Sequence, residues 1–405
     1  MKNKIISFLI LFVILNIPFS YGFTSLTIWN SLETEETNTT PSSNNIENYL
    51  NLESESAILL ELHSGKILFE KESHKQLRPA SVTKIMSLLL IMEALDRKEI
   101  TLDTQIPCSE NASSMGGSQI WLDSTETLSV DEMLKAICVV SANDCTVAMA
   151  EFLCGSEELF VQKMNERAKE LGMNDTTFKN CHGIDEENHL TSSYDIGIMS
   201  RELLKKHPEI TNYTTIWMDK LRDGHSELVN TNKLIRTYDG ATGLKTGSTS
   251  LALYNLSASA TRNNLSLIAV VLRAPTPKIR FSEAKLLLDY GFNTYCSKTL
   301  CKKDDIYQNI PVSKGSENNI NLLFEENVDI ISKKNLSSEI LESINLKENI
   351  EAPIYKGDII GTLDYFENNL KIASVNLIAE KDIPKQTLLN IFKKISLSWF
   401  SLLKT

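Results

Sequence analysis

Two strand-like pairs at opposite ends of a long helical stretch constrain the fold of this 405-residue chain more than any other feature. The apolar runs 57–62 and 67–70 flank a polar turn at His63–Lys66 and predict a β-hairpin. A second hairpin is predicted from 254–260 and 265–272, again around a polar turn. This order indicates an α+β domain in which distant segments share one antiparallel sheet, with the first two strands at its edge.

The segment between the hairpins carries helical patterns. Apolar residues lie on nearly all sides of the run from Ile85 to Leu95, which predicts a deeply buried helix. Ser192–Asp195 has the form of a capping box that opens a helix. Helices are predicted over 130–154, 156–171, 196–205 and about 280–290, the last of them covering the sheet. We therefore expect a helical subdomain beside the sheet.

The character of the chain changes at two places. Residues 23–55 are rich in Asn, Ser, Thr and Glu and lack periodicity, which favours a leader or linker on the surface. From about residue 294, short alternating segments between turn clusters predict a small all-β domain. The expected organisation is therefore an α+β domain over 56–293 followed by a β-rich domain over 294–381.

The N-terminus has the features of a secretory signal peptide over 1–22. A basic start at Met1–Lys4 precedes an apolar run, Ile5–Pro18, that is too short for a comfortable membrane span, and small residues follow up to Gly22. An uncleaved signal anchor is the alternative. Both interpretations place the protein outside the cytoplasm.

The C-terminal segment 382–405 carries a second membrane signal. After Pro384 it contains lysines and no acidic residue, and its apolar residues, Trp399 among them, recur at helical spacing. This pattern predicts an amphipathic helix that lies on a membrane surface. The alternative is a helix packed on a protein core.

Charge and composition exclude several classes of function. The formal net charge of −11 argues against nucleic acid as a partner. The six histidines are scattered without ligand spacing, so no metal site is predicted, and no motif indicates a cofactor. Seven cysteines fit no disulfide framework; most should be free thiols, although Cys296 and Cys301 could close a small loop.

Three short motifs suggest serine chemistry. Ser81 and Lys84 lie three residues apart at the predicted start of a helix and so share one face. A serine hydroxyl is a poor nucleophile until a base takes its proton, and Lys84 can do so if burial and a second cation, such as Lys245, ease loss of its own proton. The helix N-terminus also offers N–H groups to an oxyanion. Each motif alone could be a helix cap, a solvated lysine or a turn.

The third motif, Lys245-Thr246-Gly247, is predicted to open a strand. Lys245 and Thr246 could hold a substrate carboxylate, and Gly247, without a Cβ, would let a substrate backbone lie close beside it. The backbone N–H of Ser248 is a candidate oxyanion donor.

The second motif is Ser141-Ala142-Asn143. From the helical side of the site, Ser141 could relay a proton to the leaving amine and Asn143 could bind a substrate amide.

Together these motifs resemble those of the low-molecular-mass penicillin-binding proteins, the serine-type D-alanyl-D-alanine carboxypeptidases. The resemblance runs from about Ala57 to Lys381, and it rests on the stretches 78–84, 141–144, 180–183, 239–249 and 351–358. The chain has Ala142 and Leu253 where many members have glycine, and an unusual Cys145 beside the site.

The resemblance implies a β-lactamase/transpeptidase-like catalytic domain, a C-terminal β-domain and a membrane-anchoring tail. The implied reaction removes the terminal D-alanine from peptidoglycan stem pentapeptides through an acyl-enzyme on Ser81, with Lys84 as base, and β-lactams would acylate the same serine. Such an enzyme works at the outer face of the cytoplasmic membrane, on vegetative wall or spore cortex. A β-lactamase and a non-catalytic wall-binding protein are the alternatives, but no Glu for rapid deacylation is identifiable.

Overall fold

The computed structural model describes residues 50–334, 339–387 and 392. The predicted signal peptide, most of the predicted leader and most of the predicted C-terminal amphipathic helix lie outside these residues. Within the described part of the chain, no helix is both long enough and apolar enough to cross a membrane.

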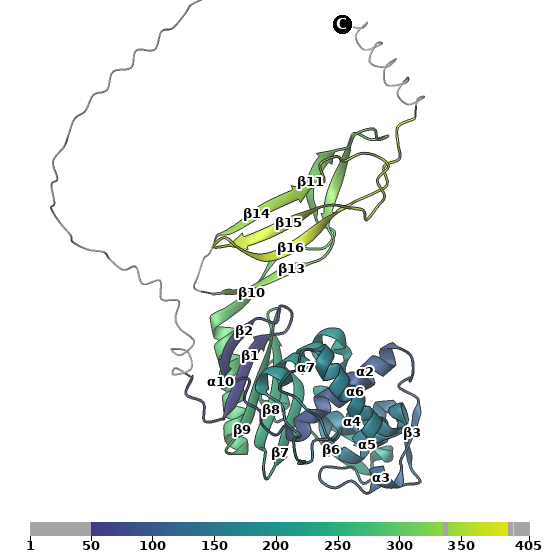
Figure 1. Ribbon diagram of the computed structural model, residues 1–405, viewed down its shortest axis with the longest axis vertical. Helices are drawn as coiled ribbons and strands as arrows, with labels where there is room; N and C mark the ends of the chain where they lie inside the picture. The colour runs from purple at the N-terminus through teal and green to yellow at the C-terminus, as the bar shows by residue number, and fades with distance from the viewer. Residues whose placement is uncertain (1–49, 335–338, 388–391, 393–405) are drawn as a thin grey trace, which may run out of the picture. The chain divides into compact units, whose positions relative to one another are not determined.

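A five-stranded antiparallel sheet forms the centre of the larger domain (Figure 1). Its strand order is β2 (Ile67–Lys71), β1 (Ser56–Glu61), β9 (Leu265–Ala274), β8 (Leu253–Arg262) and β7 (Ala241–Thr249). Both predicted hairpins are confirmed as β1–β2 and β8–β9.

The expected edge position of the first two strands is wrong for β1. This strand lies between β2 and β9, with Ile58 opposite Val270, and every residue of β1 is buried. Its continuous apolar run is typical of a strand that is covered on both faces. The edges of the sheet are β2 and β7.

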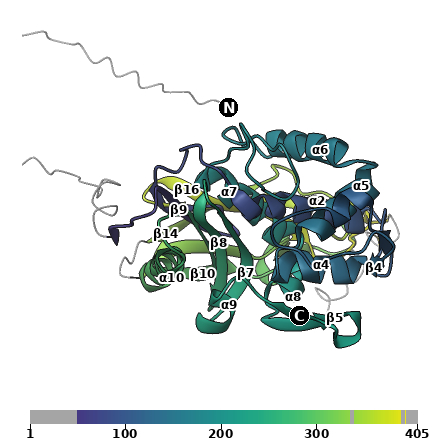
Figure 2. The same cartoon turned by 90° about the horizontal axis from the view of Figure 1, so that it is seen from below.

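Helices cover both faces of the sheet, as Figure 2 shows for α10 on one side and α2, α4 and α5 on the other. The larger layer contains α2 (Lys84–Asp96), α4 (Val130–Val139), α5 (Asn143–Cys154), α6 (Glu157–Glu170) and α7 (Ser193–Lys206). Shorter elements complete it: η1 (Ala80–Thr83), α3 (Glu110–Ser113), η2 (Pro208–Ile210), α8 (Thr211–Thr214), η3 (Arg222–Gly224) and the strand pairs β3–β4 (Gln105–Pro107, Thr127–Ser129) and β5–β6 (Met218–Leu221, Ser226–Val229). The short helix α9 (Leu234–Thr237) contributes Leu234 to the buried cluster on the α10 side.

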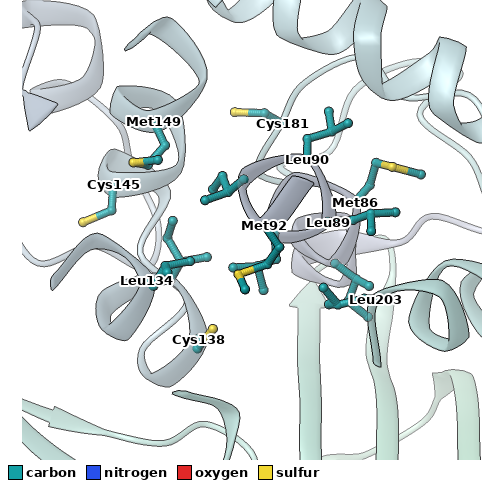
Figure 3. Packing of buried hydrophobic residues seen from close by; sticks show 14 of the residues in the cluster. Met86, Leu89, Leu90, Met92, Leu134, Cys138, Cys145, Met149, Cys181 and Leu203 are labelled. Atoms are coloured by element: carbon teal, nitrogen blue, oxygen red, sulfur yellow. The ribbon is translucent and has the colours of Figure 1, made fainter. Parts of the chain in front are cut away.

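The buried helix predicted over Ile85–Leu95 is confirmed as α2. Its side chains project in several directions into the core, Met86 and Leu89 on one side and Met92 on another (Figure 3). Leu134 of α4 and Leu203 of α7 pack around it. A helix that is apolar all round needs such neighbours on every side, and this core fixes the direction of α2 and therefore of Lys84 at its first position.

One predicted helix is divided in the structure, and one predicted capping box is only half formed. The pattern over 130–154 is divided into α4 and α5 by a turn at 140–142, where Ser141 adopts a left-handed φ of 68°. The Ser192 cap of α7 is confirmed, since its hydroxyl accepts a hydrogen bond from the N–H of Asp195. The Asp195 carboxylate does not complete the predicted capping box, because it accepts hydrogen bonds from Asp175 and Thr176.

The other face of the sheet is covered by α10 (Pro277–Thr294), which extends the predicted helix in both directions. The end of the predicted surface leader is packed here: Leu50 and Leu52 are buried in the same cluster as Leu287. Glu283 of α10 accepts hydrogen bonds from the backbone N–H groups of Glu53 and Ser54. Residues 50–55 are therefore part of the folded domain.

The second domain is all-β, as predicted. Strand β10 (Tyr295–Cys301) pairs with β13 (Val328–Lys333). A five-stranded sheet has the order β11 (Ile306–Pro311), β12 (Asn319–Phe324), β16 (Leu370–Ala379), β15 (Ile359–Glu367) and β14 (Ile340–Leu346). It has its own core, including Leu322, Leu363 and Tyr365. All seven cysteines are free, so Cys296 and Cys301 do not form a disulfide.

Candidate active site

Ser81 lies in the short 3₁₀ turn η1, immediately before α2. Side-chain contacts from the sheet hold the preceding backbone: Asn255 of β8 donates hydrogen bonds to the carbonyl oxygens of Arg78 and Pro79, at 2.8 and 2.9 Å. Ala80, next to the serine, adopts a left-handed φ of 49°. The serine is thus presented on a turn that the sheet fixes from one side.

Gly247 and Gly183 lie against this turn from two sides, and the contact of Gly247 differs from the predicted one. A Cβ on Gly247 of β7 would lie 2.9 Å from the carbonyl oxygen of Pro79 and 3.0 Å from the backbone nitrogen of Ser81. The space that the missing side chain leaves is therefore filled by the turn that carries Ser81, not by a substrate backbone as predicted. On another side, a Cβ on Gly183 would overlap the carbonyl oxygen of Ala80.

Lys84 is fully buried and its Nζ is surrounded by three oxygen atoms. The Nζ lies 3.2 Å from the hydroxyl of Ser81, 2.6 Å from Oδ1 of Asn143 and 2.7 Å from the carbonyl oxygen of His182. Burial, together with the positive charge of Lys245, lowers the pKa of Lys84 well below its ordinary value. A neutral amine held this close to a hydroxyl is able to accept its proton.

Lys245 lies within β7, since the third motif occupies the middle of this strand and does not open it as predicted. Its Nζ donates to the carbonyl oxygen of Thr246, and burial lowers the pKa of Lys245 to about 7. The Thr246 hydroxyl donates to that of Thr231. Arg280 of α10 donates to the carbonyl oxygen of Gly247, which secures the same strand from its other side.

The second motif occupies the turn between α4 and α5. Asn143 uses its carbonyl oxygen to accept from Lys84 and its amide to donate to the carbonyl oxygen of Gly116. Asn143 therefore orients Lys84. The sequence predicted only that Asn143 would bind a substrate amide. Ser141 is buried, and its hydroxyl has no hydrogen-bond partner among the described residues.

The remaining predicted residue, Ser248, is exposed on β7 and lies opposite Tyr254 of β8. Cys145, noted beside the second motif, is buried in α5, and burial raises the pKa of its thiol well above the ordinary value. The thiol is thus protonated and unreactive at neutral pH. Leu253 adopts a left-handed φ of 55°, which explains why a glycine suits that position.

Sequence reasoning missed the backbone groups that complete the site. The carbonyl oxygens of His182 and Gly116 receive hydrogen bonds from Lys84 and Asn143, but any residue type provides a carbonyl. Asp144 follows the second motif, and the sequence predicted no function for it. Its buried carboxylate accepts from the N–H groups of Ile120 and Leu122, which fixes the loop beside Gly116.

The fit of Gly183 against the serine turn leads to a prediction. We expect Gly183→Ala to lower stability and the reactivity of Ser81 together, because a Cβ at a φ of 92° would force the backbone of Ala80 to move. Gly155→Ala is the matched control: Gly155 has a φ of 85° but nothing within 4 Å of its Cβ position, so only the strain of about 1–2 kcal/mol applies. Thermal unfolding and the rate of acylation of Ser81 compare the two variants. Equal losses in both would contradict the steric explanation.

The geometry agrees with the comparisons with known proteins. Residues 39–276 match the sequence profile described as D-alanyl-D-alanine carboxypeptidase, which covers more than half of the chain. The chain belongs to this carboxypeptidase family. Residues 295–385 match a second profile, the C-terminal domain of penicillin-binding protein 5. The protein is therefore a hydrolase of the serine-type D-Ala-D-Ala carboxypeptidase class.

Individual members of the carboxypeptidase family resemble the chain over most of its length. D-alanyl-D-alanine carboxypeptidase DacF from Bacillus subtilis is 44% identical over 351 residues, which cover 86% of this chain and 90% of that protein. A crystal structure of penicillin binding protein 5 from Haemophilus influenzae superposes on this chain with a TM-score of 0.69 at 30% sequence identity. The match covers 82% of this chain and 98% of that chain. Penicillin-binding protein D2 from Listeria monocytogenes, in its ampicillin-bound form, matches with a TM-score of 0.55 at 29% sequence identity. This match covers 60% of this chain and 98% of that chain.

Proposed function

We propose that the protein removes the terminal D-alanine from peptidoglycan stem pentapeptides through an acyl-enzyme on Ser81. The observation that carries this proposal is the position of the Lys84 Nζ, 3.2 Å from the Ser81 hydroxyl and in surroundings that lower its pKa. The neutral amine accepts the hydroxyl proton while Oγ attacks the carbonyl carbon of the scissile D-Ala–D-Ala bond. The serine ester that results keeps the shortened peptide on the enzyme.

The second half of the reaction needs a proton for the leaving amine and a water to release the peptide. Ser141 is suited to pass the proton from Lys84, since its buried hydroxyl is free to reorient. The Ser81 N–H, beside the helix start, and the Ser248 N–H are the expected donors to the oxyanion. Water then attacks the carbonyl carbon of the ester. Lys84 accepts the proton of the water and passes it to Oγ of Ser81, which releases the shortened peptide as a carboxylic acid.

The substrate terminus is a carboxylate, and the third motif is suited to bind it. Lys245 and Thr246 lie on the strand that passes beside the Ser81 turn. The ammonium group of Lys245 is buried, so it attracts a carboxylate more strongly than an ammonium group in water does. A substrate carboxylate that pairs with Lys245 also favours the protonated form of the lysine.

Labelling with a fluorescent penicillin, followed by peptide mapping, tests the proposal. The adduct should lie on the peptide that contains Ser81, and the purified chain should release D-alanine from a peptide that ends in D-Ala-D-Ala. Ampicillin occupies the similar Listeria protein, which supports the choice of probe. A long-lived adduct distinguishes this function from a β-lactamase, which would discard the label rapidly. Labelling elsewhere, or no release of D-alanine, would contradict the proposal.

The pKa of Lys245 predicts an alkaline limb in the pH profile. As the pH rises through about 7, the free enzyme loses the positive charge that binds the substrate carboxylate, so kcat/KM should fall. Lys245→Arg keeps the charge at all these pH values, and its alkaline limb should move to higher pH even if its maximal rate is lower. Steady-state kinetics between pH 5 and about 10 measures the shift. Identical limbs in the two proteins would show that another group titrates.

We further propose that residues 1–22 direct export and that the later part of the segment 382–405 attaches the enzyme to the outer face of the membrane. The first residues of this segment belong to the β-domain instead, where Ile383 is buried and pairs with Ile354. The sequence patterns at the two ends support this placement. Removing the residues after Pro384 should release the protein from membranes and leave penicillin labelling intact. Continued membrane association of a chain cleaved near Gly22 and shortened after Pro384 would rule out this anchor.

A further inference from the structure

Three potential metal ligands meet at the far end of α2 from Ser81. Asp96 is the last residue of α2, His207 follows the last residue of α7, and Glu209 lies in η2. Their ligand atoms all lie within 4.8 Å of one another. The Nδ1 of His207 is 3.0 Å from Oδ2 of Asp96 and 3.8 Å from Oε1 of Glu209.

The imidazole of His207 is the part of this cluster that points to a ligand. The side chain is 5% exposed, and its Nδ1 has no hydrogen-bond partner despite the nearby carboxylate oxygen. The pair His74–Asp175 is different, because there Nδ1 and Oδ2 form an ordinary hydrogen bond at 2.7 Å. A buried nitrogen that lies close to two carboxylates, but is aligned with neither for hydrogen bonding, has the arrangement of one ligand beside two others.

The distances fit a small cation. Two ligands that are each about 2.1 Å from a tetrahedral zinc ion are separated by about 3.4 Å, and the two distances from Nδ1 lie on either side of that value. One imidazole and two carboxylates form a set that zinc accepts, with water at the fourth position, whereas Mg²⁺ and Ca²⁺ prefer oxygen alone.

The electrostatic surroundings also favour a cation. The C-terminal ends of α2 and α7 meet here, and each brings the negative end of a helix dipole. Within the described part of the chain, neither Asp96 nor Glu209 forms an ion pair with a lysine or arginine. The nearby Arg97 guanidinium pairs with Glu93 and Glu99, and its interaction with the Asp96 carboxylate acts from beyond ion-pair distance.

We propose that Asp96, His207 and Glu209 form a structural site for a divalent transition-metal ion, best matched by Zn²⁺, that ties the end of α2 to the end of α7. Sequence spacing carried no sign of this site, because Asp96 comes from a different helix and the fold alone brings it to the other two. The ion would hold in place the helix whose first residue is Lys84, and it takes no part in the reaction at Ser81.

Zinc titration of the full chain, freed of metal with a chelator, tests the site by calorimetry and thermal unfolding. We expect saturable binding of one Zn²⁺ per chain and a rise in Tm of about 5 °C at a hundredfold excess over Kd. Millimolar Mg²⁺ should not displace the ion. Co²⁺ should bind in its place with visible absorption bands of a nitrogen–oxygen site.

Variants separate this site from incidental binding. Asp96→Asn and Glu209→Gln alter exposed side chains, so both proteins should fold, and each should weaken binding at least about tenfold, since even outer partners of metal ligands have that effect. His207→Gln should abolish the saturable binding. His74→Gln, which removes the hydrogen-bonded pair, is the matched control and should bind as the unaltered chain does. Equal affinity in all four variants, or displacement by Mg²⁺, would overturn the proposal.

Discussion

Replacing Ser81 with alanine will remove D-alanine release and penicillin labelling together. The hydroxyl is the only group of this residue that can form the acyl bond, and loss of a serine nucleophile typically lowers kcat by roughly 10⁴-fold or more. The fold should be unaffected, because η1 is held through the backbone of Arg78 and Pro79. Release of D-alanine from a synthetic peptide, with mass spectrometry of the penicillin-treated protein, measures both effects.

Ser87→Ala is the control for this experiment. Ser87 is a buried serine one turn along α2 from Lys84, and its hydroxyl donates to the carbonyl oxygen of Cys181. Its removal should lower the free energy of unfolding by about 1 kcal/mol and leave the labelling in place. If Ser81→Ala still accepted the label, or if both variants lost it equally, the assignment of the nucleophile would be wrong.

Replacing Lys84 with methionine is expected to have the second largest effect. The hydroxyl of Ser81 would lose the only amine within hydrogen-bonding distance in the described structure. General bases contribute about 10²- to 10⁴-fold, and we expect a loss in the upper part of that range in both kcat and the rate of acylation by penicillin. Stopped-flow acylation and steady-state release of D-alanine report the two rates separately.

Two further variants separate the base from a simple charge. Lys84→Arg keeps a cation but does not lose a proton at accessible pH, so it should be as inactive as Lys84→Met. Lys169→Met removes an exposed lysine of α6 and should behave as the unaltered chain does. Substantial activity in Lys84→Arg would mean that the lysine acts through its positive charge alone.

Much of the fold was predictable from local patterns. The hairpins at 57–70 and 254–272 and the helix α2 are set by apolar runs and turn residues that are close in sequence. The position of β1 inside the sheet was not, because strand order depends on pairing with β9, which lies far along the chain. The break at 140–142 was not predicted either, because apolar residues at helical spacing on both sides of Ser141 favoured one helix, and the residue type alone does not show that this serine has a positive φ.

The candidate site shows the same division. The residue types in the three motifs were enough to name Ser81, Lys84 and Asn143, which the fold brings into hydrogen-bonding contact. The reason for Gly247 was wrong, since its neighbour is the enzyme's own turn and only a three-dimensional contact reveals that. Carbonyl groups such as that of His182 have no sequence signal at all.

The burial of Leu50 and Leu52 against α10 has a practical meaning for protein production. A fragment that starts at the first strand would expose the apolar surface these two leucines cover and would leave Glu283 without its two backbone donors. Expression vectors for crystallisation or inhibitor screening should therefore begin upstream of residue 50.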